Sequence, residues 1–329
     1  MRRPALAALA AATVFALSGC GAEAGASDTE FTIVATTTQV ADFTRAIVGD
    51  TPGVTVTQLI QPNQSAHSFD PSVADLAVLG RADALVANGV GLESWLDDAI
   101  QASGFDGATI ESSEGITLLD GAADDAHADE PTDEHADEHA GNPHVWTDPR
   151  NATAMVDTIA SALGDTDPAH REDFDANAKA YDDKLAQLDD WTRANVETVP
   201  VDERLLVSNH DALGYLTAAY DITYVGSVIP SFDDNAEPSA AEIDKLVAAI
   251  KETGVKAVFS EASLNPKAAQ TIANEAGVRV YSGEDALYVD SLGPAESDGE
   301  TYIAAQLHNV TVILDSWGVT PTAVPVELE

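Results

Sequence analysis

The chain has 329 residues, with 56 Asp and Glu against 15 Lys and Arg, which gives a formal net charge of −41 at pH 7. This dense negative charge excludes nucleic acid as a partner and disfavours contact with anionic lipid headgroups. A single cysteine excludes an internal disulfide and a thiolate metal cluster. We interpret most of the acidity as a solvated surface and expect a functional role only for the run at residues 120–140.

The first 19 residues have the features of a signal peptide. Two arginines follow the initiating methionine, and residues 4–17 are uncharged and rich in Ala and Leu. That stretch is shorter than the roughly 20 apolar residues of a membrane-spanning helix. It ends in Leu17-Ser18-Gly19-Cys20, which resembles a bacterial lipoprotein cleavage site and predicts that Cys20 becomes the lipidated first residue. The alternative is an ordinary secretory signal with an incidental cysteine.

After a flexible tether at residues 20–30, apolar runs alternate with amphipathic stretches, as in α/β units. The first half predicts strands at 31–36, 54–60 and 82–87, and helices at 41–48, 72–79 and 92–102. The second half predicts strands at 205–208, 223–228, 257–260 and 278–281, and helices at 240–253, 266–276 and 301–317. We therefore predict an α/β fold of two lobes, 31–166 and 200–329, each with a small, mostly parallel sheet.

A single long helix is predicted between the lobes, within the linking segment 167–199. From 168 to 199 there is no internal Pro or Gly, and apolar residues recur at spacings of three or four. Asp167-Pro168 suits a helix start, and Pro200 suits its end. A stiff helix of this kind predicts limited closure when a ligand binds.

The acidic run at residues 120–140 lies inside the first lobe and contains His127, His135 and His139. Nine of its 21 residues are Asp or Glu, which predicts a disordered, solvated insertion that also binds metal weakly. Residues 135–139 match the H-x-x-E-H pattern of a zinc peptidase. Because large apolar residues that could pack a catalytic helix are nearly absent there, we expect no peptidase activity from it.

Three other histidines lie where a predicted strand meets a loop or helix. His67 follows the second strand, His144 follows the acidic run, and His210 ends an apolar strand. Ligands of open α/β sheets bind beyond the carboxyl ends of the strands, where such side chains can converge. Imidazoles with carboxylates close by attract a divalent cation, zinc above all. We expect His170 and His308 to lie on helix faces or on the surface instead.

Several sequence blocks resemble the zinc and manganese cluster of solute-binding lipoproteins of ABC importers. Beside the lipoprotein signal they are His67-Ser68-Phe69-Asp70-Pro71, Asn142-Pro143-His144-Val145-Trp146-Thr147-Asp148-Pro149, Ser208-Asn209-His210-Asp211-Ala212-Leu213-Gly214-Tyr215-Leu216 and Tyr288-Val289-Asp290-Ser291-Leu292-Gly293. The resemblance covers nearly all of residues 31–317. It implies two lobes joined by a rigid linking helix, and one metal ligand from each block: His67, His144, His210 and Asp290.

The chain departs from the family pattern in one block and offers a competing ligand in another. Ser65-Ala66 precedes His67 where the family often has Asp-Pro. Asp285 competes with Asp290 for the fourth position, and the Asp-Ser-Leu-Gly context favours Asp290. Three imidazoles and one carboxylate suit Zn²⁺, whereas members that resemble manganese carriers tend to have a carboxylate where His210 stands.

The resemblance implies a binding protein and not an enzyme. We expect a lipid-anchored monomer on the outer face of the cytoplasmic membrane, which captures Zn²⁺ and passes it to an ABC permease and its ATPase. Zn²⁺ is then cargo and not a catalytic cofactor. A manganese receptor of the same family, a secreted zinc-dependent hydrolase and an adhesin or metal buffer are the alternatives. A closed shell of protein ligands would argue against the hydrolase, because catalytic zinc keeps an open position.

Overall fold

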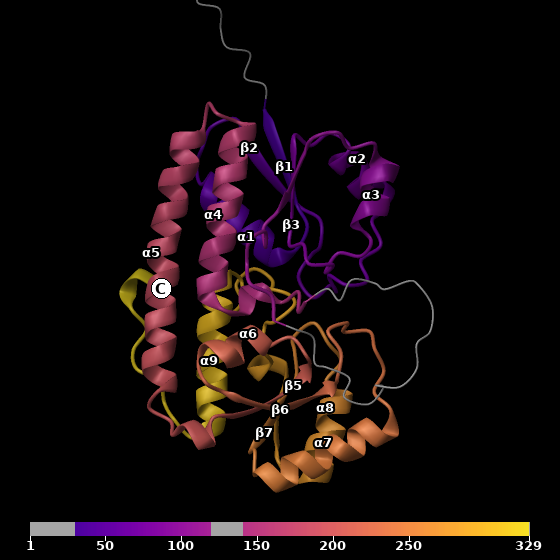
Figure 1. Ribbon diagram of the computed structural model, residues 1–329, viewed down its shortest axis with the longest axis vertical. Helices are drawn as coiled ribbons and strands as arrows, with labels where there is room; N and C mark the ends of the chain where they lie inside the picture. The colour runs from indigo at the N-terminus through magenta and orange to yellow at the C-terminus, as the bar shows by residue number, and fades with distance from the viewer. Residues whose placement is uncertain (1–29, 120–140, 329) are drawn as a thin grey trace, which may run out of the picture.

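The computed structural model describes residues 30–119 and 141–328. Two α/β lobes lie one above the other, and a long helix runs along one side of both (Figure 1). The predicted fold class is therefore confirmed. The signal peptide 1–19, Cys20, most of the tether and the acidic run 120–140 lie outside the described residues. Within the described ranges, no helix is both long and apolar enough to cross a membrane.

The first lobe is built on one parallel sheet with strand order β2-β1-β3-β4. Its strands are β1 (Phe31–Ala35), β2 (Val54–Gln58), β3 (Ala84–Ala87) and β4 (Ala108–Glu111), and its connecting helices are α1 (Thr38–Val48), α2 (Val73–Leu79) and α3 (Leu96–Ser103). Every residue of the inner strand β3 is buried, whereas β2 alternates as an edge strand does. The strand order reverses between β1 and β3, so their carboxyl ends form the crevice where ligands of such sheets bind.

The second lobe contains two parallel strand pairs in place of one continuous sheet. β5 (Leu205–His210) pairs with β6 (Thr223–Ile229), β7 (Ala257–Phe259) pairs with β8 (Arg279–Tyr281), and β5 lies beside β7. The helices are α6 (Gly214–Ala219), α7 (Ala240–Thr253), α8 (Lys267–Ala276) and α9 (Tyr302–Trp317). Short 3-10 turns occur at η1 (Val145–Thr147), η2 (Val201–Glu203), η3 (Gly283–Asp285) and η4 (Val326–Leu328).

Helix α4 (Pro149–Thr166) was not predicted, although the sequence contains residues typical of a helix start. The Asp148 side chain caps the helix by accepting from the Arg150 backbone N–H, and Pro149 occupies the first turn. Both are standard start features of a helix. The helix packs between the first sheet, α1 and the linking helix. Strand β4 and helix α6 were likewise not predicted.

The linking helix is α5 (Arg171–Val196), a few residues shorter at each end than predicted. Its apolar stripe is buried as expected, but in two different cores. Phe174 and Leu188 belong to the core of the first lobe, and Trp191 belongs to that of the second. One continuous helix therefore contributes packing to both lobes (Figure 1).

The last residues of the chain run back along α5, beside the C label of Figure 1. Thr322 exchanges hydrogen bonds with Asn195, and its carbonyl accepts from Trp191 Nε1. Val324 packs against the cores of both lobes, and Leu328 is buried in the core of the first. The C-terminal segment is thus a further connection between the lobes.

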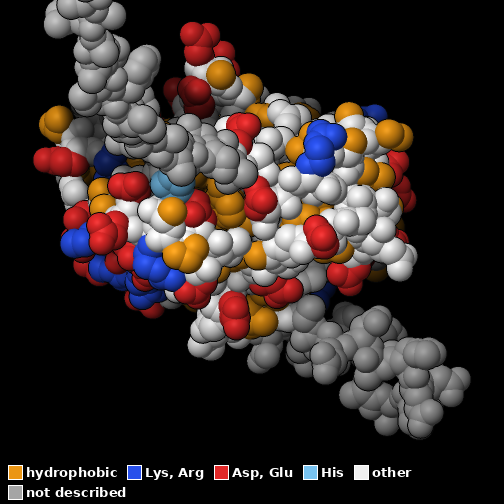
Figure 2. All heavy atoms as spheres, turned by 90° about the horizontal axis from the view of Figure 1, so that it is seen from above, with side chains coloured by type: hydrophobic (Ala, Val, Ile, Leu, Met, Phe, Trp, Pro, Cys, Tyr) orange, Lys and Arg blue, Asp and Glu red, His pale blue; other side chains and the backbone are white. Residues whose placement is uncertain are grey.

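Acidic side chains are scattered over the face seen in Figure 2, and Lys and Arg gather mainly towards one side of it. This scatter agrees with the interpretation of most of the acidity as a solvated surface.

Replacing Phe174 by Ala should lower the free energy of unfolding by about 3–5 kcal/mol, because the ring is fully buried and its loss leaves a cavity. Urea denaturation followed by circular dichroism measures the change. Asp175→Ala is the control, since Asp175 is exposed on the same turn. Equal midpoints for the two variants would show that α5 is not packed into the first lobe as described.

Candidate metal centre

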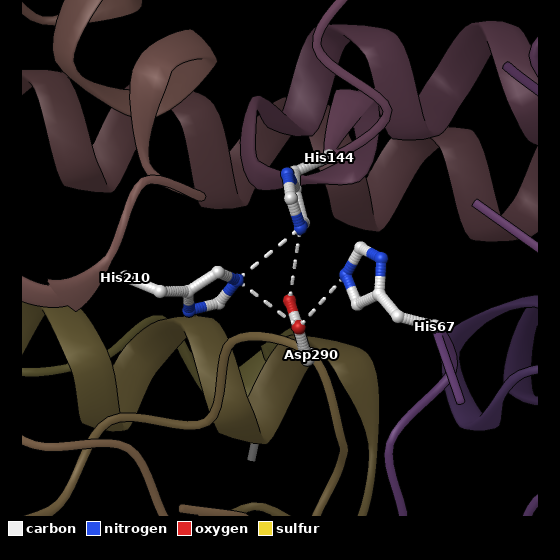
Figure 3. A group of neighbouring side chains, drawn as sticks. All are labelled: His67, His144, His210 and Asp290. Atoms are coloured by element: carbon white, nitrogen blue, oxygen red, sulfur yellow. Dashed lines mark hydrogen bonds and ion pairs between the residues drawn. The ribbon is translucent and has the colours of Figure 1, made fainter. Parts of the chain in front are cut away.

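The four side chains predicted as ligands meet between the lobes (Figure 3). One possible ligand atom from each of His67, His144, His210 and Asp290 lies within 4.8 Å of all the others. The three Nε2 atoms face the Asp290 carboxylate, at 3.3 Å from His67, 3.3 Å from His144 and 3.1 Å from His210. Each lobe supplies two of the four residues, as the resemblance implied.

The group is almost completely withdrawn from solvent. The exposed fraction of the side chain is 0% for His144 and His210, 1% for Asp290 and 8% for His67. Both Asp290 oxygens and His67 Nε2 are buried and make no hydrogen bond to a described residue, although they lie at ion-pair distance from groups of the same cluster. Unsatisfied buried polar atoms are costly, so such atoms aimed at one point need an explanation. A divalent cation bonded to all four side chains would satisfy them.

His144 is oriented by Asn142, two residues earlier. The Asn142 side-chain oxygen accepts from the His144 backbone N–H at 3.0 Å and from Nδ1 at 2.8 Å. Because Nδ1 carries the proton, the neutral ring directs the Nε2 lone pair towards Asp290. The loop is fixed further by Asn88, whose side chain donates to the Pro143 carbonyl at 3.0 Å. This anchoring explains why an Asn-Pro-His sequence precedes the turn η1.

His210 is oriented in the same way by Glu261, a residue that the sequence reasoning missed. His210 ends β5, Glu261 follows β7, and their Nδ1 and Oε1 atoms lie 2.5 Å apart. A carboxylate that accepts from Nδ1 fixes the tautomer and makes Nε2 a stronger donor to a metal. The available indication was the position of Glu261 directly beyond a predicted strand, where residues of a site are expected.

The first lobe holds the loop that carries Asp290. The Val289 carbonyl accepts from Gln39 Nε2 at 2.7 Å and from Trp146 Nε1 at 3.1 Å. The Leu292 N–H donates to Thr38 Oγ1 at 2.9 Å. Thr38 and Gln39 begin α1, directly after β1. The strand-order reversal of the first sheet therefore positions a side chain that belongs to the second lobe.

The remaining candidates lie elsewhere. Asp285, the competitor for the fourth position, is half exposed and pairs with Arg279 at 3.4 Å. His170 Nδ1 lies 2.5 Å from an Asp167 oxygen, and His308 Nε2 lies 2.9 Å from the Ala286 carbonyl oxygen. His127, His135, His139 and Cys20 are outside the described residues.

Burial and charge give the four side chains different protonation states. Burial lowers the pKa of His144 to about 4, against the opposing charge of Asp290, so this ring is neutral at pH 7. Burial also disfavours the charged form of His210, but Asp290 and Glu261 raise its pKa well above the usual value. Burial favours the neutral form of Asp290, yet His210 and His144 hold its pKa well below the usual value. His210 and Asp290 thus form an ion pair when no metal is bound.

A family described as zinc-uptake complex component A, periplasmic (ZnuA), matches residues 33–316. The chain belongs to this family. The sequence resemblance is thereby confirmed, and the chain is a metal-binding solute-binding protein of the ABC importers rather than an enzyme.

Relatives within the family are named for different metals. The manganese-binding lipoprotein MntA of Halalkalibacterium halodurans is 30% identical over 296 residues, which are 89% of this chain and 91% of that protein. The high-affinity zinc uptake system protein ZnuA of Bacillus subtilis is 32% identical over 286 residues, 86% of each. The structure of the periplasmic zinc-binding protein TroA from Treponema pallidum has a TM-score of 0.75 at 24% identity, covering 88% of this chain and 99% of that one. That likeness shows the fold.

Binding of Zn²⁺ at pH 7 should release protons, because metal bonded to His210 Nε2 displaces the proton that its raised pKa retains. The affinity should therefore fall as the pH is lowered, and fewer protons should be released as the pH rises through the pKa of His210. Calorimetric titration in two buffers with different ionisation enthalpies counts them. Glu261→Gln removes one charge that raises the pKa of His210, so the variant should release fewer protons when Zn²⁺ binds. Heats that are independent of the buffer at pH 7 would contradict the ion pair.

Proposed function

We propose that this chain captures Zn²⁺ outside the cytoplasmic membrane and delivers it to the permease and ATPase of an ABC importer. The observation that carries the proposal is the buried set of three Nε2 atoms around one carboxylate. Three nitrogen donors and one oxygen donor match the tetrahedral preference of zinc. His67, His144, His210 and Asp290 are the proposed ligands.

Zinc is favoured over manganese by the chemistry of the donors. Relatives carry the names of both metals, so membership of the family does not decide between them. Manganese prefers oxygen ligands, and divalent affinity for nitrogen sites is much higher for zinc. The Glu261 and Asn142 contacts direct nitrogen lone pairs into the site, which supports the same choice.

The secreted hydrolase is not supported. Catalytic zinc sites leave one coordination position for water, and four protein ligands would complete the tetrahedral shell. The same family membership that identifies a solute-binding protein argues against catalysis.

We further propose that Cys20 carries the lipid that anchors the mature chain as a monomer to the outer face of the membrane. The Leu-Ser-Gly-Cys sequence supports this anchor, and MntA relatives are named as lipoproteins. The tether that follows would let the two lobes reach a membrane-embedded permease.

Zn²⁺ should displace Mn²⁺ from the wild-type chain. His210→Asp should lower the ratio of Zn²⁺ affinity to Mn²⁺ affinity by at least tenfold, because an oxygen donor replaces a nitrogen donor. Competition calorimetry with each metal measures the two affinities. His170→Asp is the matched control, since it makes the same change away from the site and should leave the preference unaltered. Equal affinity of the wild type for both metals would count against zinc as the cargo.

His127, His135 and His139 are proposed as an auxiliary set that collects metal for the site. The described residues on either side of the run are tied together. Asn142 N donates to the Leu119 carbonyl at 2.9 Å, and the Tyr215 hydroxyl accepts from Leu119 N and donates to the Asn142 carbonyl. The position of His144 is thus secured from outside the run.

Deleting residues 120–140 should leave the tight Zn²⁺ site intact and remove additional weak binding. The weak component should fade with added salt, because it depends on the local concentration of cations near dense negative charge. Calorimetric titration at low and at physiological ionic strength separates the two components. His144→Ala is the comparison and should abolish the tight event. Loss of the tight event in the deletion variant would place the run within the primary site.

A further inference from the structure

His67 differs from the other three proposed ligands in how it is held. It is the most exposed of them, and it lies on a loop between β2 and α2. The rings of His144 and His210 are fixed from behind by Asn142 and Glu261. The position of the His67 ring therefore depends on the contacts that hold its loop.

The second lobe holds this loop on both sides of His67. Ser65 Oγ donates to Asp234 Oδ1 at 2.9 Å, and Ser68 Oγ lies 3.4 Å from Asn235 Oδ1. Asn235 Nδ2 also donates to Asp234 Oδ1 at 2.6 Å. Asp234 and Asn235 belong to the segment that joins β6 to α7.

Asp234 is an unusual residue for this position. Its exposed fraction is 6%, and burial of a carboxylate is unfavourable unless hydrogen bonds offset the cost. The same oxygen accepts from both Ser65 and Asn235, which joins a residue of each lobe at one atom. The hydrogen bonds to this carboxylate are of the stronger, charge-assisted kind.

We propose that Asp234 is a positioning residue of the metal site, which latches the His67 loop to the second lobe and slows the release of bound metal. This inference rests on the proposed function, since it concerns the same four ligands.

The latch controls release because the His67 side is the least enclosed side of the site. The other three proposed ligand side chains are at most 1% exposed, and they or their loops are held by buried contacts within and between the lobes. Moving the His67 loop away requires the Ser65–Asp234 bond to break. The latch should therefore affect the dissociation rate, whereas the donor set itself governs which metal is bound.

The test is the rate of Zn²⁺ release from the loaded full chain, followed by stopped-flow mixing with a chromogenic chelator. Asp234→Ala should release Zn²⁺ roughly tenfold faster, as expected for loss of a hydrogen bond to a charged acceptor. Asp234→Asn keeps an oxygen that accepts from Ser65 but loses the charge that strengthens the bond, so its release rate should lie between those of the wild type and Asp234→Ala. Ser65→Ala should also accelerate release, and the double variant should be no faster than Asp234→Ala, because the Ser65–Asp234 bond is already absent in Asp234→Ala.

Glu237→Ala is the matched control, because it removes an exposed charge from the same segment. Equal acceleration by Glu237→Ala and Asp234→Ala would show a general charge effect and overturn the latch. Equal acceleration by Asp234→Asn and Asp234→Ala would overturn it too. Ser65→Ala provides the answer if an Asp234 variant fails to fold. A wild-type chain that binds no Zn²⁺ would instead overturn the proposed function, whereas tight binding with unchanged release rates would overturn the latch alone.

Discussion

The contact between the buried Asp290 carboxylate and three imidazoles is the interaction on which the arrangement of both lobes depends. A carboxylate this deeply buried is unfavourable unless positive charge faces it. His210 supplies that charge when protonated, and a bound dication would supply it otherwise. Because Thr38, Gln39 and Trp146 of the first lobe hold the loop around Asp290, the lobes are joined where this charge is concentrated.

The imidazoles of His144 and His210 differ in their protonation states. Burial beside the uncharged Asn142 amide keeps His144 neutral, whereas Asp290 and the Glu261 carboxylate raise the pKa of His210 and favour its protonated form. In the proposed site, a cation would bond His144 directly but would have to displace a proton from His210. The site therefore combines one donor that is ready at neutral pH with one that couples binding to the pH of the surroundings.

Local patterns in the sequence predicted the elements that local forces determine. The apolar stripe along α5 and the strands that end before His67 and at His210 could be predicted, because both patterns lie in residues close together in the sequence. Glu261 could not be assigned as the partner of His210, because 51 residues separate them and no local pattern records the contact. The choice between Asp290 and Asp285 had to come from the resemblance, since only packing shows one carboxylate buried and the other at the surface. Helix α4 was overlooked although its cap was present.

The C-terminal segment has a consequence for recognition at the membrane. With Leu328 buried in the first lobe and Thr322 bonded to α5, the C-terminal segment joins the two lobes along the edge that α5 follows, in addition to α5 itself. We expect such a molecule to change little in outline between its loaded and unloaded forms. On that expectation, a permease would distinguish the two forms by the local order of loops on the more exposed side of the site, where the His67 loop meets the segment of Asp234. Discrimination between the loaded and unloaded forms would then depend on how rigid these loops are, more than on the shape of the whole protein.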